Sequence, residues 1–158
     1  METFIKFAYT GQIFWDDVTN FQDLILNADF FGLVDIKEEA IKIFAADHLG
    51  PLNALDAYHY SDIWSNSILK EKSQKTILQN FEAISKTEKF LKLNINSFKD
   101  ILSSNPFTSC TQDMFDGILR WVDDDSAVRI MYLMDLFGLI QFGHADLHIM
   151  VKIATEYK

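Results

Sequence analysis

The residues whose spacing best suits chemistry are two histidines, His144 and His148, in the stretch HADLH. Two histidines four positions apart can share one face of a helix, which is the spacing of paired zinc ligands. Asp146 and the aspartate run at 123–125 could add oxygen donors. However, no glutamate follows the first histidine as in the metalloprotease motif, and the single cysteine, Cys110, is distant in sequence. A polar helix end explains the same residues, so a metal-binding helical protein is kept only as a remote alternative.

Nucleophilic and phosphate-binding chemistry have less support. Cys110 has no histidine near it in sequence, and a cysteine without an activating neighbour behaves as a small, inert residue. The stretch GLIQFG, residues 138–143, lacks the lysine and the preceding strand that phosphate-binding loops use. We therefore predict no catalytic residues, no bound metal or other cofactor, and no enzymatic activity.

Composition and charge narrow the class of protein. The chain has 158 residues, of which 49% are apolar and 14% aromatic, as in an ordered globular protein. Its net charge is −9, and residues 1–66 hold 11 acidic residues against 3 basic ones. An acidic surface repels phosphate backbones, so nucleic acid is not an expected partner. The acidic first part is either a solvated face or an acidic docking surface.

The chain gives no sign of a membrane or secretory location. A transmembrane helix needs about 20 mostly apolar residues, and the most apolar stretch, 130–142, is shorter and contains Asp135 and Gln141. The beginning of the sequence does not look like a secretory signal, and a lone Cys110 cannot form an internal disulfide. We expect the cytoplasm or the nucleus.

Hydrophobic periodicity predicts an all-α fold of consecutive antiparallel helix pairs. Apolar residues recur at three and four positions along most of the chain, with one short strand expected near residues 12–15. The predicted helical segments are 18–31, 35–49, 52–63, 68–84, 90–93, 95–102, 111–122, 130–140 and 146–157. The residues expected in the core are Phe21, Leu24, Phe44, Phe81, Phe115 and Trp121.

Several residues are expected to begin or end these helices. Gly32 should end the first helix, and Asp35 should cap the second. The pair Ser85 and Glu88 has the spacing of a capping box. In the predicted helix at 111–122, Gly117 should cost about 1 kcal/mol relative to alanine if it lies in the helix interior.

Several stretches of the predicted helices resemble sequence motifs of a known family. FAYTGQI at 7–13 and NFQDLILNADFFGLVDIKEEAIKIFAADHL at 20–49 resemble the C-terminal part of a BTB (POZ) domain. The stretch at 53–93 is similar to the helical extension and first BACK helices of Kelch-like proteins. FKDILSSN and DMFDGILRWVDDD resemble the middle of BACK. The resemblance implies a BTB part over 1–50 and a helical extension with BACK over 51–158.

Kelch-like proteins are non-catalytic adaptors, so the resemblance implies an adaptor or protein-interaction module. In that family the BTB domain and its extension dock on the cullin-3 scaffold of a ubiquitin ligase, BACK spaces and orients, and a Kelch propeller holds the substrate. The positions that the resemblance marks as candidate cullin contacts are Tyr9, Asn27, Asp29, Phe30, Asn53, Tyr58 and His59, the last three as the lining of a groove.

These candidates also have purely structural interpretations. Tyr9 could pack its ring locally, and His59 could be a core or boundary histidine. Phe30 and Phe31 are adjacent on a helix, so their side chains point about 100° apart and at least one should lie near the edge of the buried stripe.

Relative to that family, we expect this chain to lack the first half of the BTB domain and the propeller. Cullin-3 binding should then be weakened, and apolar surface should favour self-association or association with BTB family members. The alternative function is a truncated or interfering fragment that acts only by protein association.

Overall fold

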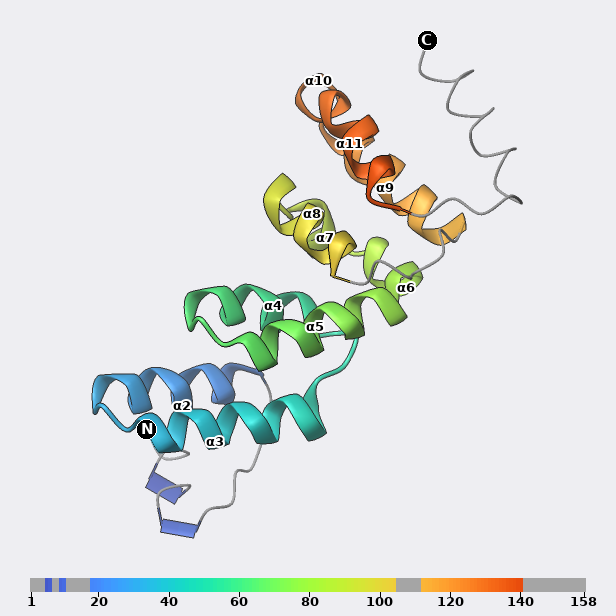
Figure 1. Ribbon diagram of the computed structural model, residues 1–158. Coiled ribbons are helices and arrows are strands. Elements are labelled where there is room, and N and C mark those ends of the chain that lie inside the picture. Colours follow the sequence, from blue (N-terminus) through green and yellow to red (C-terminus); the bar gives the residue numbers. More distant parts are fainter. Residues whose placement is uncertain (1–4, 7–8, 11–17, 105–111, 141–158) are drawn as a thin grey trace. The chain divides into compact units, whose positions relative to one another are not determined.

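The computed structural model describes residues 5–6, 9–10, 18–104 and 112–140, and every regular element of this described part is a helix (Figure 1). The predicted all-α class is therefore confirmed, while the strand expected near residues 12–15 lies outside the described residues. The helices are α2 (Val18–Phe30), α3 (Val34–Ile43), the π-helix η1 (Phe44–His48), α4 (Ala54–Ile63), α5 (Ser67–Gln79), α6 (Phe81–Ser85), α7 (Glu88–Leu91), α8 (Ile95–Ser103), α9 (Gln112–Asp124), α10 (Ser126–Arg129), the 3-10 helix η2 (Ile130–Tyr132) and α11 (Leu133–Gly138).

The chain divides into two compact units, Met1–Ser73 and Gln74–Lys158, and the boundary falls inside α5. In the first unit, α2 and α3 lie side by side and bury one face of each helix (Figure 1). The α2 face has the three- and four-residue spacing of an amphipathic helix. Its buried members are Phe21, Leu24, Ile25 and Ala28.

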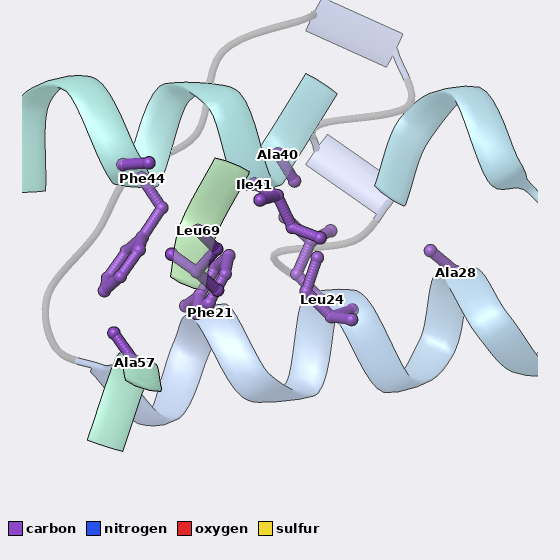
Figure 2. Packing of buried hydrophobic residues seen from close by; sticks show 10 residues of the cluster. Phe21, Leu24, Ala28, Ala40, Ile41, Phe44, Ala57 and Leu69 are labelled. Atoms are coloured by element: carbon purple, nitrogen blue, oxygen red, sulfur yellow. The ribbon is translucent and has the colours of Figure 1, made fainter. Parts of the chain in front are cut away.

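Two stacked phenylalanines hold the centre of this first core (Figure 2). The rings of Phe21 and Phe44 lie 4.0 Å apart and nearly parallel, and Trp64 packs edge-on against Phe21 at 5.4 Å. Ala57 of α4 and Leu69 of α5 belong to the same buried cluster. Aromatic pairs of this kind add stability beyond the area that they bury, so this stacking stabilises the packing of α2 against η1.

Gly32 ends α2, as predicted, and the turn that it makes is a Schellman motif. The N–H of Leu33 donates to the carbonyl of Ala28 at 2.8 Å, and the N–H of Gly32 donates to that of Asp29 at 3.1 Å. Gly32 has a φ of +67°, which glycine adopts without the steric cost that a Cβ brings. The chain therefore reverses direction within three residues and enters α3.

The end of α4 has the same motif without glycine. Ser65 has a φ of +50°, the N–H of Asn66 donates to the carbonyl of Ser61 at 2.9 Å, and the N–H of Ser65 donates to that of Asp62 at 3.3 Å. The Asn66 side chain then accepts a hydrogen bond from the N–H of Leu69 at 2.8 Å and so caps the start of α5. The turn is well bonded but strained at its left-handed serine.

Two predicted helix caps are wrong. Asp35 does not cap α3, because Leu33 occupies the cap position without a side-chain bond and Asp35 lies in the first turn. An acidic residue there still interacts favourably with the helix dipole. Ser85 does not begin a capping box either, because its hydroxyl donates to the carbonyl of Glu82 inside α6. Thr87 is the cap of α7 and accepts the N–H of Phe90 at 3.3 Å.

Two predicted helices also differ from those observed. The helix expected over 68–84 is divided at Asn80, whose side-chain amide donates to the carbonyl of Thr76 at 2.9 Å. The helix predicted over 52–63 begins later, at Ala54, and the apolar residues at the two ends of the predicted range, Leu52 and Ile63, are exposed. The buried face of α4 instead consists of Ala54, Ala57, Tyr58 and Ser61.

The second unit has its own aromatic core. Rings pack in succession from Phe81 to Phe90 to Phe98 to Trp121, with centroids 5.1–5.5 Å apart. Gly117 of α9 faces α6 so closely that a Cβ on it would lie 2.5 Å from Cε1 of Phe81. The glycine that looks unfavourable in sequence therefore allows α6 and α9 to approach each other.

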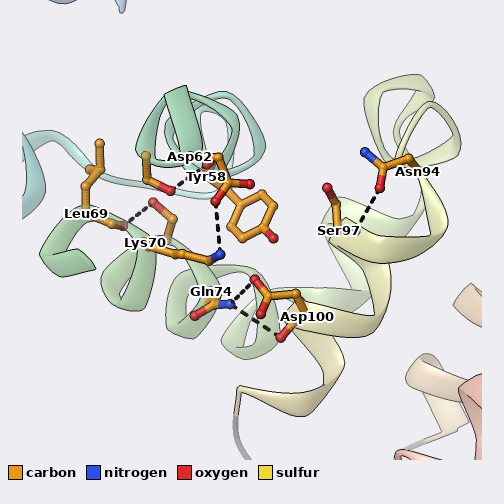
Figure 3. Close-up of polar contacts among 10 residues, drawn as sticks. Tyr58, Asp62, Leu69, Lys70, Gln74, Asn94, Ser97 and Asp100 are labelled. Atoms are coloured by element: carbon orange, nitrogen blue, oxygen red, sulfur yellow. Dashed lines mark hydrogen bonds and ion pairs between the residues drawn. The ribbon is translucent and has the colours of Figure 1, made fainter. Parts of the chain in front are cut away.

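Partly buried polar contacts fix the ends of the helices in this unit. The guanidinium of Arg129 lies over the Trp121 ring at 4.3 Å and donates to the carbonyls of Trp121 at 2.7 Å and Leu91 at 3.0 Å. The side-chain amide of Gln74 donates to the carboxylate of Asp100 at 3.0 Å (Figure 3). These bonds join α7 with α9 and α5 with α8, where unpaired polar groups would be costly.

Candidate interaction surface

The most unusual surface of the first unit is an exposed apolar patch at the turn between α2 and α3. We call it the apolar corner; it consists of Leu26, Phe30, Phe31, Leu33 and Val34, all of which are exposed. The last buried residue of α2 is Ala28, so Phe30 and Phe31 lie beyond its buried stripe. Because the Schellman turn brings Leu33 and Val34 next, apolar residues continue across the reversal of the chain.

Phe30 is the most prominent side chain of the corner. It is 83% exposed, and Phe31 is 53% exposed. Their rings meet edge to face at 5.1 Å, so each covers part of the other without burying it. We had expected at least one of the two near the edge of the buried stripe, and the structure leaves both exposed because the helix ends there.

Acidic residues surround the apolar corner. Between residues 23 and 39 the sequence has five acidic residues and a single lysine. That lysine, Lys37, is bound to the carboxylate of Asp29 at 2.7 Å, and Asp23, Asp35 and Glu38 are exposed. An apolar surface with an acidic border favours a partner with basic residues around its own apolar contact.

Three of the predicted contact residues lie together on α2 at this corner. Phe30 and Asp29 are exposed, and Asn27 is half-buried with its amide donating to the carbonyl of Asp23 at 2.6 Å. Tyr9 is 88% exposed, so the alternative in which its ring packs locally is not what the structure shows. Tyr9 and Phe30 are therefore both accessible to a partner.

The other three candidates do not form a groove. Tyr58 is 2% exposed, and its place on a groove wall was wrong because it belongs to the buried face of α4. Asn53 holds the loop before α4, since its side chain accepts the N–H of Gly50 and donates to the carbonyl of His48, both at 2.8 Å. His59 is exposed beside Tyr60 and is the most accessible of the three, whereas Asn53 is half-buried.

The residues that we expected in the core are placed as follows. Phe21, Leu24, Phe44, Phe81, Phe115 and Trp121 are all at most 3% exposed. The sequence reasoning missed Leu26, Leu33 and Val34 as surface residues. A signal existed for Leu33 and Val34, because the four apolar residues that flank Gly32 cannot all face one core.

The described residues contain no group of three or more histidine, cysteine or acidic side chains that could hold a metal ion. The histidines of the HADLH stretch, His144 and His148, lie outside the described ranges, as does Cys110. No helix in the described part of the chain is long and apolar enough to cross a membrane.

One exposed ion pair at the end of α6 shifts the pKa values of both its members. The hydrogen bond and the charge of Lys86, 2.6 Å away, lower the pKa of Glu82 below its ordinary value, and Glu82 raises the pKa of Lys86. Glu82 borders an open hollow of about 340 Å³, where the side chains of Gln79 and Asp113 are exposed as well. A solvent-exposed ion pair of this kind contributes little to the stability of the fold. We assign it no catalytic or binding role.

Comparison with known proteins decides the family. The family model described as "BTB And C-terminal Kelch", abbreviated BACK, matches residues 54–154. The chain belongs to the BACK family. It is 25% identical over 168 residues to Kelch-like protein 17 of Mus musculus, which covers 100% of this chain and 26% of the relative. It is 30% identical over 125 residues to Kelch-like protein 24 of Homo sapiens, covering 77% of this chain and 20% of the relative.

A third similar protein is also a Kelch-like protein. Kelch-like protein 25 of Xenopus tropicalis is 30% identical over 144 residues, covering 90% of this chain and 24% of the relative. The resemblance to Kelch-like proteins is thereby confirmed. The chain spans about a quarter of the length of these curated relatives. The BACK match begins at the start of α4, so the apolar corner precedes it, in a part of the chain that is aligned with Kelch-like protein 17.

Proposed function

We propose that this chain is a non-catalytic adaptor module that docks on the cullin-3 scaffold of a ubiquitin ligase through the apolar corner. The observation that carries the proposal is the exposed corner itself, in a chain of the Kelch-like family. The resemblance to that family implies cullin-3 as the partner, and three of the positions that it marks, Asn27, Asp29 and Phe30, lie at this corner. We place this function in the cytoplasm or the nucleus.

The geometry supports docking on physical grounds. Phe30 has the exposure of an interface anchor, and burying a phenylalanine in a partner is worth about 1.5–3 kcal/mol. The acidic border orients the partner and raises the association rate rather than supplying most of the affinity. Tyr9 and His59 are further exposed positions open to a partner, whereas Tyr58 is buried.

The test is calorimetric titration of the chain with the N-terminal domain of cullin-3. Phe30→Asp should weaken binding by about 10-fold to 150-fold, which is the loss of about 1.5–3 kcal/mol. The matched control is Leu52→Asp, because Leu52 is 94% exposed and lies outside the apolar corner. Equal weakening by both substitutions would contradict the proposed surface.

A longer chain separates the docking proposal from its main alternative. Extension upstream to a complete BTB domain should strengthen cullin-3 binding, because the resemblance implies further contacts there. If neither the short nor the long chain binds cullin-3, the adaptor proposal fails.

The alternative is a fragment that acts only by association with itself or with BTB family members, and the exposed apolar corner is the observation that favours it. Sedimentation velocity then decides, because this alternative predicts oligomers of the wild-type chain that Phe30→Asp converts to monomers. Leu52→Asp is again the control and should leave the oligomers unchanged. If the wild-type chain is monomeric at every concentration tested, the self-association alternative is excluded.

A further inference from the structure

Two methionine side chains are unusually exposed in the second unit, on the segment from α10 to α11. Met131 of η2 is 70% exposed, and Met134 of α11 is 73% exposed. Methionine is among the residue types that are most often buried in proteins. The third methionine of the described residues, Met114 of α9, follows this rule and is 3% exposed. Packing of the core therefore does not explain why Met131 and Met134 are methionines.

The two methionines belong to a larger apolar surface. We call it the methionine stripe; it consists of Val128, Ile130, Met131 and Met134, all of which are exposed. The exposed positions of the neighbouring α9 are all polar or charged instead. Within this pair of helical segments, the exposed apolar surface is therefore confined to the methionine stripe.

The segment that carries the methionine stripe is held in place by other side chains. Nζ of Lys99 binds the Asp135 carboxylate at 2.6 Å and lies 5.8 Å from the centre of the Tyr132 ring. The segment is apolar on its buried side as well, where Phe137 stacks on Phe115 of α9 at 5.2 Å. Because these contacts do not use the thioethers, a change of polarity at the two exposed methionines should leave the core of the unit in place.

We propose that Met131 and Met134 form a reversible oxidation site, with a peroxide as the oxidant and a methionine sulfoxide reductase as the enzyme that restores them. In the forward step the thioether sulfur attacks one oxygen of hydrogen peroxide, the O–O bond breaks and an S–O bond forms. The hydroxide that leaves takes up the proton of the transferred oxygen, so the products are a sulfoxide and water. The sulfur loses two electrons, which reduce the peroxide. In the reverse step a dithiol of the reductase is oxidised to a disulfide, and the oxygen leaves as water.

The modification changes the chemical character of the methionine stripe. A thioether is apolar and adapts its shape to a neighbour, whereas a sulfoxide is polar. Met131 and Met134 are three residues apart in a helical segment, so they occupy neighbouring positions on one face. Their oxidation therefore places two polar groups together in an apolar surface, and the surface becomes apolar again when both are reduced.

Oxidation of the folded chain tests the proposal. In a Cys110→Ser background, which removes the thiol, the whole chain is treated with hydrogen peroxide and digested with trypsin. Fragment-ion mass spectrometry then locates the sulfoxide at each methionine. Met131 and Met134 should be oxidised at least about tenfold faster than Met114, because Met114 is buried. In urea the three rates should be alike, and equal rates in the folded chain would overturn the proposal.

Reduction of the oxidised chain tests whether the site is reversible. The two reductases that act on the two sulfoxide epimers should restore both thioethers in the folded chain. The urea midpoint should be the same before oxidation, after oxidation of Met131 and Met134, and after reduction. Sulfoxides that resist both reductases would overturn the proposal, as would a urea midpoint that falls when only these two methionines are oxidised.

A matched variant tests the change in surface character. Retention on a hydrophobic-interaction column should fall when the chain is oxidised and recover when it is reduced. The double variant Met131→Leu, Met134→Leu keeps the stripe apolar but removes the thioethers, so peroxide should leave its retention unchanged. If peroxide lowers the retention of the double variant as much as that of the parent chain, the change does not arise at the methionine stripe and the proposal fails.

The oxidation site is independent of cullin-3 docking. The apolar corner contains no methionine, and it lies in the first unit, whereas the methionine stripe lies in the second. Oxidation of Met131 and Met134 should therefore leave a calorimetric titration with cullin-3 unchanged, and failure of either proposal does not affect the other.

Discussion

Gly117→Ala provides a test in which the sequence and the structure predict opposite signs. In sequence terms a glycine inside α9 is a weakness, and alanine should stabilise the helix by about 0.8–1.0 kcal/mol. In the structure a Cβ at this position would lie 2.5 Å from Cε1 of Phe81 and 3.0 Å from Cβ of Ser85. Both distances are shorter than an ordinary contact between carbon atoms, so one of the two helices has to move.

The size of the destabilisation depends on how far Phe81 and Ser85 can move away from the added Cβ. Phe81 is 3% exposed and packs edge-on against Phe90 at 5.5 Å, so its ring is held by its neighbours. The Cβ of Ser85 is attached directly to the backbone of α6. Overpacking of a core costs about 1–3 kcal/mol, and a clash with two fixed groups should lie near the upper end. After subtraction of the helix gain, Gly117→Ala should lower the free energy of unfolding by about 1–2 kcal/mol.

Urea denaturation followed by circular dichroism measures this change. Gly138→Ala is the matched control, because no heavy atom lies within 4 Å of its added Cβ. The control should be neutral or stabilising by up to about 1 kcal/mol. In a Phe81→Leu background the ring atom is gone, so the penalty of Gly117→Ala should fall by about 1 kcal/mol or more. If Gly117→Ala itself stabilises the chain, the close approach of α6 and α9 is refuted.

Three further predictions concern single side chains. Gly32→Ala should lower the free energy of unfolding by about 1–2 kcal/mol at its φ of +67°, while Ser65→Gly should raise it by about 0.5–1 kcal/mol at φ +50°; urea midpoints that move in one direction would contradict the shared turn geometry. Arg129→Lys should lower the free energy of unfolding by about 1–3 kcal/mol, because an ammonium cannot stack flat on Trp121 while donating to two carbonyls. If the unfolding midpoint followed by tryptophan fluorescence does not change, these contacts are dispensable. Phe44→Ala should cost about 3–5 kcal/mol, and thermal unfolding checks it, since a loss below 1 kcal/mol would mean that the cavity collapses.

The candidate contact residues show which side-chain exposures could be predicted from the sequence and which could not. Phe30 was identified from the resemblance, and it is exposed as a contact residue needs to be. Tyr58 was identified in the same way, and it is buried while its neighbour His59 is exposed. Adjacent residues on a helix point about 100° apart, so a shift of one position in assigning the buried face exchanges an interface residue for a core residue.

Of the helix ends, one was predictable from the residue type alone and another depended on the tertiary structure. Gly32 was correctly predicted to end a helix, because its lack of a Cβ is a property of the residue alone. Ser85 and Thr87 have nearly the same capping ability, and choosing between them required the direction of the chain after α6. Ser85 is engaged by its own helix, which leaves Thr87 as the cap of α7.

The sequence by itself determined the all-α class that the described residues confirm, the relation to Kelch-like proteins, and a core that includes Phe21, Phe44, Phe81, Phe115 and Trp121. These properties depend on periodicity and residue type, which are local. Only the tertiary structure decided that Phe30 and Phe31 lack a cover, that Gly117 is a point of close approach, and that α10–α11 is apolar on both sides. The physical reason is that burial depends on which element lies opposite a helix face, and the pattern on one helix does not specify its neighbour.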